Sequence, residues 1–176
     1  MHVGIIDMNY NPDGIRYLRQ ALLGYEVTVV RYGPNLLERV RRSPIQTWIC
    51  SGGAHLILEA GAPHIPLSLL DLPEKRFMLI CYSMESVLLQ LGYRMRTHRI
   101  PLKGYFILHE SKFWQNHFRY VKPADLTGSA IKVLERSKGE VMTATYKNAL
   151  LVQWHPERSA DGRRFLDAWI RSSDIL

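Results

Sequence analysis

The sequence is poor in cysteine: among 176 residues only Cys50 and Cys81 occur. Two cysteines cannot form a disulfide framework, and they suit a reducing compartment, so we expect a cytoplasmic protein. No cysteines and histidines have the spacing of a zinc site, so we expect no metal and no other cofactor. The chain also lacks any apolar run near the ~20 residues that would span a bilayer, which argues against a membrane partner.

The N-terminal stretch, MHVGIIDMNY, lacks the basic region of an export signal, and acidic Asp7 interrupts its short apolar run. It therefore predicts a first strand. Acidic residues are fewer than basic ones, 16 against 23, which gives a net charge of +7. Basic residues cluster in 39-RVRR-42 and 94-RMRTHRIPLK-103. No recognised nucleic-acid module surrounds them, so we expect a solvated basic face or, alternatively, a docking surface for an acidic protein.

Strands and helices alternate through the first half of the chain. Predicted helices follow the strands after turn signals such as Pro34, and Gly24 and Gly92 close two of them. This alternation is typical of an open, mostly parallel α/β sheet with helices on both faces. The predicted strands are 2–7, 26–32, 45–53 and 76–81, and the predicted helices are 14–24, 35–42 and 83–92.

The second half has strand-forming content and little helix, so we expect additional antiparallel strands there. An amphipathic helix over 161–173 would then close the chain. No repeat, low-complexity tract or linker divides the sequence, which predicts a single domain over residues 1–176. The additional predicted strands are 104–108, 118–121, 130–135, 140–146 and 149–154.

Three polar segments follow predicted strands: 51-SGG-53, Cys81 and 154-WHPE-157. In open α/β sheets, reactive sites lie beyond the carboxyl ends of the parallel strands, so we expect these segments to meet. Cys81 lies where a strand turns sharply into a helix, a geometry that exposes a nucleophile and stabilises a thiolate. Taken alone, a cysteine there is more often a small buried hydrophobe.

His155 and Glu157 change that balance. Residues two apart on an extended segment point to the same side, so the carboxylate can orient the imidazole toward the thiol. The chemistry of a thioester also needs backbone N–H groups that stabilise an oxyanion. The amide of Tyr82 and the amide of Gly53 are the candidates, because glycine lets the backbone approach a substrate closely.

The glycine turn, the cysteine elbow and the His-Pro-Glu ending, in this order, resemble the class I glutamine amidotransferase family. That family includes the glutaminase parts of GMP synthetase and anthranilate synthase, and γ-glutamyl hydrolases. The resemblance covers nearly the whole chain and implies a flavodoxin-like sheet. It also implies a Cys81–His155–Glu157 triad that hydrolyses glutamine through a thioester, with Gly53 and Tyr82 as oxyanion donors.

The resemblance further implies substrate contacts from Gly52, from position 85, and from Asn116 and His117, which lie where the family has a substrate-contacting turn. Position 85, where the family usually has glutamine, holds Glu85. A carboxylate accepts hydrogen bonds and cannot donate them unless protonated, and its charge raises the pKa of a neighbouring thiol.

The elbow itself departs from the family pattern at two positions. Leu79 and Ser83 stand where the family usually has glycines, which let the strand and helix pack closely. In the glycine turn, Ala54 replaces a common proline.

Three functions remain compatible with these residues. The first is a glutaminase that acts within a larger amidotransferase and supplies ammonia to a separate synthase, for which the basic surface would be the docking face. The second is a stand-alone hydrolase of γ-glutamyl or related amides, with Glu85 contacting a different substrate group. The third is a non-catalytic regulatory or binding relative.

Overall fold

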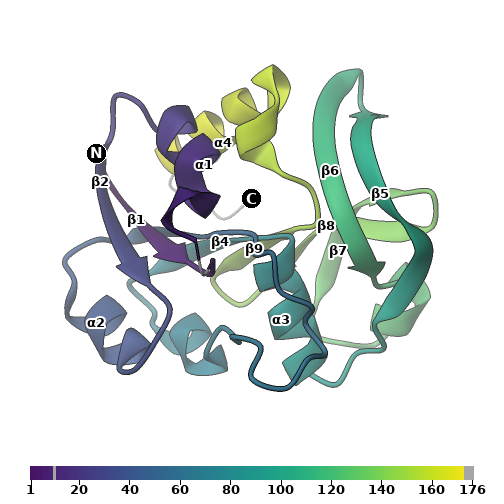
Figure 1. The fold of residues 1–176 in the computed structure, drawn as a ribbon, viewed down its shortest axis with the longest axis horizontal. Coiled ribbons are helices and arrows are strands. Elements are labelled where there is room, and N and C mark those ends of the chain that lie inside the picture. The colour runs from purple at the N-terminus through teal and green to yellow at the C-terminus, as the bar shows by residue number, and fades with distance from the viewer. Residues whose placement is uncertain (10, 173–176) are drawn as a thin grey trace.

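The computed structural model describes residues 1–9 and 11–172 of the chain. A seven-stranded sheet crosses the molecule in the order β2-β1-β3-β4-β9-β8-β7 (Figure 1). Strands β2, β1, β3, β4 and β9 pair in parallel, and β8 and β7 continue the sheet antiparallel. Their bounds are β1 (His2–Asp7), β2 (Glu26–Arg31), β3 (Thr47–Cys50), β4 (Arg76–Ile80), β7 (Lys132–Ser137), β8 (Glu140–Tyr146) and β9 (Ala149–Val152).

Helices cover both faces of this sheet. In Figure 1, α1 (Arg16–Ala21) and α4 (Ala160–Arg171) lie on one face, and α2 (Leu36–Arg42) and α3 (Tyr82–Gln90) lie on the other. The central strands are consequently buried on both sides, which explains their unbroken apolar sequences. Short 3₁₀ helices occupy Pro12–Ile15, Leu67–Asp71, Pro123–Leu126 and Pro156–Arg158.

A long hairpin stands beside the main sheet (Figure 1). It consists of β5 (Arg96–Leu108) and β6 (Ser111–Tyr120), which form a separate two-stranded antiparallel sheet. Its apolar side packs on the core through Phe113, whose ring centroid lies 4.3 Å from that of Trp154. Between Thr97 and Leu102 the pairing register shifts, so that β5 contains a pronounced bulge.

The predicted fold class is confirmed, including the antiparallel strands of the second half. Two local predictions were wrong. The helix expected over 14–24 is α-helical only over Arg16–Ala21, because the preceding turn is a 3₁₀ helix. The hairpin strands are much longer than predicted, so the basic segment 94–103 lies largely within β5. Within the described residues, no helix combines the length and the apolar character required to cross a membrane.

The first prediction concerns the packing of β1 against β3. A Cβ atom on Gly4 would lie 2.2 Å from Cε3 of Trp48, whose fully buried indole donates a hydrogen bond to the carbonyl of Ile45. Because the indole cannot move without losing that bond, we expect Gly4→Ala to cost about 1–3 kcal/mol of stability. Urea unfolding measures this, with Leu23→Ala, at an exposed position, as the control. Equal stability of the two variants would contradict the prediction.

Candidate active site

Cys81 occupies the sharp connection between β4 and α3. Its backbone is strained, with φ 48° and ψ −104°, a conformation that non-glycine residues rarely adopt. Hydrogen bonds on both sides hold it: the Cys81 N–H donates to the Val152 carbonyl at 2.7 Å, and the Glu85 N–H donates to the Cys81 carbonyl at 2.9 Å. The sheet and the helix thus impose the elbow that the sequence predicted.

The two residues that replace the family's glycines fit this elbow. Leu79 is fully buried in the core between the sheet and the helices of one face. The hydroxyl of Ser83 is also buried and donates a hydrogen bond to the Ser51 carbonyl at 2.6 Å. Ser83 therefore ties the first turn of α3 to the glycine turn that follows β3.

His155 lies just beyond β9 and faces the elbow. Its backbone N–H donates to the Trp114 carbonyl of β6 at 2.8 Å, and its ring Nδ1 lies 2.8 Å from Oε1 of Glu157. The other ring nitrogen, Nε2, is buried and has no hydrogen-bond partner among the described residues. The imidazole is thus oriented by a carboxylate on one side and keeps a free nitrogen on the other.

Gly52 lies between the histidine and the cysteine. A Cβ at this position would be 3.0 Å from Cε1 of His155 and 3.8 Å from Cβ of Cys81, so both side chains border the same small space. The Gly52 carbonyl is held by Asn9, whose side-chain amide donates to it at 3.1 Å. The segments after β3, β4 and β9 therefore meet as the sequence predicted, although the role of Asn9 was missed.

A cleft of about 340 Å³ opens beside Cys81. Glu85, Arg119 and the hairpin residues Asn116 and His117 line it together with Gly53 and Tyr82, whereas Gly52 lies outside the lining. The segment expected as a turn at 114–121 belongs instead to strand β6 up to Tyr120. A larger depression, about 550 Å³, lies near the start of β3 and β4 and contains neither cysteine nor histidine.

The electrostatics of the cleft oppose ionisation of the thiol. Burial raises the pKa of Cys81 well above its usual value, and the negative charges of Glu85 and Glu157 raise it further. The Tyr82 backbone N–H and the Gln153 side chain act in the opposite direction. The direction expected for Glu85 from the sequence is therefore confirmed.

Glu85 is itself perturbed. Burial raises the pKa of its carboxyl to about 7, against the lowering effects of the hydrogen bond from Gln153 and of the charges on Arg119 and His155. Gln153 Nε2 donates to Glu85 Oε1 at 2.9 Å. Sequence reasoning missed Gln153, although its position two residues before His155 placed it at the same strand end.

No protein-family model and no curated protein sequence matches the chain. Among solved structures, it is similar to a Thermoplasma acidophilum protein designated as one candidate component of GMP synthase. The TM-score is 0.68 and the sequence identity 17%, over 97% of this chain and 92% of that one. The chain thus has a class I amidotransferase-like fold, as the sequence motifs predicted.

The second prediction follows from the pKa of Cys81. Removing the charge of Glu85 in Glu85→Gln lowers the pKa of Cys81, so more thiolate is present and alkylation by iodoacetamide is several-fold faster at about pH 8.5. At about pH 6, where Glu85 is largely protonated in the parent protein, the difference should disappear. Mass spectrometry follows the labelling at Cys81.

The matched control for this measurement is Glu135→Gln, which removes a carboxylate outside the cleft. It should alkylate at the parent rate at both pH values. A rate for Glu85→Gln equal to that of the parent at the higher pH would show that Glu85 does not influence the thiol.

Proposed function

We propose that the chain is a class I glutamine amidotransferase, which hydrolyses the side-chain amide of glutamine and supplies ammonia to a separate synthase. The observation that carries the proposal is the meeting of a strained cysteine elbow with a carboxylate-oriented histidine whose Nε2 is unpaired among the described residues. A structural cysteine needs neither the strained backbone nor such a histidine. Cys81, His155 and Glu157 are accordingly nucleophile, base and orienting residue.

The first half-reaction forms a thioester. His155 Nε2 takes the proton of Cys81, and the sulfur attacks the amide carbon of glutamine to give a tetrahedral oxyanion. The backbone amides of Tyr82 and Gly53, which border the cleft beside Cys81, are the proposed donors to this oxyanion. The imidazolium then returns its proton to the leaving nitrogen, the C–N bond breaks, and ammonia departs.

The second half-reaction hydrolyses the γ-glutamyl thioester. His155 now takes a proton from water, and the resulting hydroxide attacks the thioester carbon. The C–S bond breaks, the proton returns to sulfur, and glutamate leaves. Glu157 stabilises the imidazolium in both halves through its 2.8 Å contact with Nδ1.

The raised pKa of Cys81 means that the thiol is protonated in the free protein at neutral pH. Proton transfer to His155 must therefore accompany attack on the substrate. This requirement suits an enzyme that avoids wasteful hydrolysis, because the nucleophile forms only when the cleft is occupied.

The cleft also offers opposite charges for the amino-acid end of glutamine. Glu85 can pair with an α-ammonium group, and the Arg119 guanidinium can pair with an α-carboxylate. Nε of Arg119 is buried and has no hydrogen-bond partner among the described residues, which leaves a donor available. Glu85 would then replace the usual glutamine of the family in a different way, as a charge partner of the substrate.

The separate synthase is proposed on two grounds. The similar structure from Thermoplasma acidophilum is designated as a component of GMP synthase, which in that protein denotes one part of a larger assembly. In this chain, exposed arginines at the end of α2 and along β5 form a basic surface that an acidic face of a partner would complement.

The third prediction tests catalysis directly. Purified protein given glutamine should release ammonia and glutamate in equal amounts, with or without the partner that co-purifies. Cys81→Ala should abolish this activity, and His155→Ala should reduce kcat about 10²–10⁴-fold because the general base is lost. His109→Ala, which changes an exposed histidine on the hairpin, is the control and should retain parent activity.

A glutamine-mimicking electrophile provides the second readout for this prediction. It should label Cys81 in the parent and leave Cys50, which is fully buried, unmodified. If neither turnover nor labelling occurs even with the co-purifying partner present, the chain is a non-catalytic relative and the proposal is wrong.

Glu85 favours one alternative, a hydrolase of γ-glutamyl amines, because its carboxylate beside the nucleophile could contact a cationic leaving group instead. The fourth prediction separates the two functions. In the amidotransferase, Glu85→Gln preserves or raises glutaminase kcat, because the thiol pKa falls. In the hydrolase, it selectively raises KM for γ-glutamyl compounds with cationic leaving groups. Steady-state kinetics on both substrates distinguish these results.

A further inference from the structure

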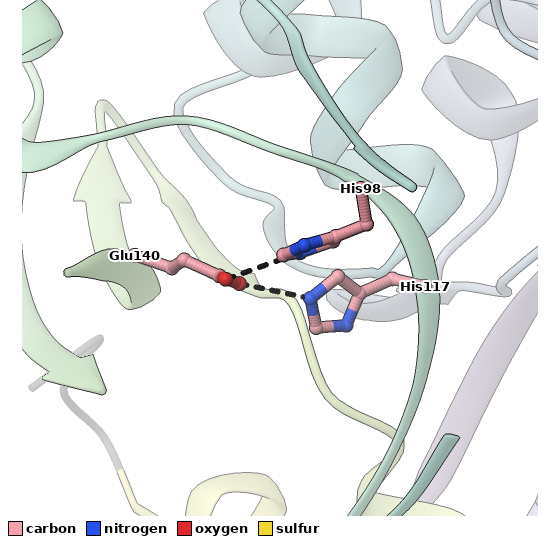
Figure 2. A group of neighbouring side chains, drawn as sticks. All are labelled: His98, His117 and Glu140. Atoms are coloured by element: carbon pink, nitrogen blue, oxygen red, sulfur yellow. Dashed lines mark hydrogen bonds and ion pairs between the residues drawn. The ribbon is translucent and has the colours of Figure 1, made fainter. Parts of the chain in front are cut away.

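Two histidines of the hairpin converge on one carboxylate of the main sheet, away from the proposed triad. Figure 2 shows His98 of β5 and His117 of β6 with their rings directed at Glu140, the first residue of β8. His98 Nε2 lies 3.1 Å from Oε1 of Glu140, and His117 Nε2 lies 3.0 Å from Oε2. The possible ligand atoms of the three residues lie within 4.8 Å of one another.

The backbone is shaped to produce this convergence. His98 begins the bulge of β5, in which the register shifts between Thr97 and Leu102, and bulges redirect side chains. Its ring is further fixed by stacking on Tyr120, with ring centroids 4.4 Å apart. Glu140 follows a tight turn in which Lys138 and Gly139 both have positive φ, which fixes the start of β8.

Hydrogen bonding satisfies this cluster only in part. The side chains of His117 and Glu140 are 0% and 7% exposed, and that of His98 is 18% exposed. Nε2 of His117 is hydrogen-bonded to the carboxylate, but Nε2 of His98 is not aligned for a hydrogen bond despite its short distance. A buried carboxylate beside a poorly bonded imidazole nitrogen is costly, and buried charges are normally paired or coordinate metals.

We propose that His98, His117 and Glu140 bind a divalent transition-metal ion, with zinc as the ion that suits them best. Two imidazole nitrogens and one carboxylate are a common zinc ligand set, with water or an added ligand in the fourth position. In a tetrahedral zinc site, neighbouring ligand atoms lie about 3.3 Å apart, close to the two distances measured here. Magnesium and calcium prefer oxygen ligands and do not suit imidazoles.

The site would fasten the hairpin to the main sheet. His117 and its neighbour Asn116 line the cleft of Cys81, and the Asn116 carbonyl lies 3.7 Å from Cys81 Sγ. Metal binding at His117 therefore holds one wall of that cleft against β8. The inference rests on the cluster alone and is independent of the proposed glutaminase activity.

The fifth prediction is measured by zinc binding without any substrate. The chain carrying Cys81→Ser, which removes the reactive thiol as a competing ligand, is stripped with a chelator and titrated with Zn²⁺ against a chromophoric chelator. One equivalent should bind, and Co²⁺ should give the visible absorption of a four-coordinate site. Zinc at about 100-fold its Kd should raise Tm by roughly 5–10 °C.

In the same background, His98→Ala and Glu140→Gln should each weaken zinc binding by at least about tenfold and remove the rise in Tm. His109→Ala and Glu135→Gln are the matched controls, because they disrupt an exposed histidine–carboxylate pair at 3.1 Å and should change neither result. Circular dichroism checks folding, and the partly exposed His98 provides the variant least disruptive to the core. If the parent binds no zinc, or His98→Ala binds it equally well, the cluster is only a hydrogen-bonded clasp.

Discussion

The parallel register of β3, β4 and β9 determines where everything else at the cleft lies. Cys50 pairs with Leu79, and Ile80 pairs with Val152, so the three strands end at one level of the sheet. The residues that follow them, the glycine turn, Cys81 and the segment leading to His155, emerge side by side. A shift of two residues in any of these pairings would move one group by roughly 7 Å and separate nucleophile from base.

The same crowding creates an electrostatic conflict. Glu157 is needed to orient His155, and Glu85 adds a second carboxylate to the buried surroundings of Cys81, so both raise the thiol pKa. The conflict is relieved only in part, because Glu85 has a pKa of about 7 and takes a hydrogen bond from Gln153. A cationic substrate group placed at Glu85 would neutralise that charge and lower the thiol pKa at the moment of attack. Substrate binding and activation of the nucleophile would thereby be linked.

Much of this arrangement was predictable from the sequence, for a definite physical reason. The strand ends are marked by local patterns: apolar runs ending in small or polar residues, and two residues of alternating direction at His155 and Glu157. Gln153 and Asn9 carried no such pattern, because their contacts are made across the fold with groups far away in sequence. The length of the hairpin was also missed, since its exposed strands alternate with charged residues that resemble a solvated loop. The metal-ligand cluster escaped for the same reason, as its members are 19 and 23 residues apart in sequence and become neighbours only through the bulge in β5.

The hairpin therefore concentrates the features that distinguish this chain within its fold. It supplies the wall of the cleft through Asn116 and Arg119, yet it forms its own two-stranded sheet. Its attachments to the rest of the protein include the Trp114–His155 backbone contact and the packing of Phe113 on Trp154, both at the end nearer α4. The cluster at Glu140 adds an attachment near the bulge, on the side of His117 that faces β8. Fixing both parts of the hairpin keeps β6 at a constant distance from Cys81, and this wall determines which side chain can enter beside the nucleophile.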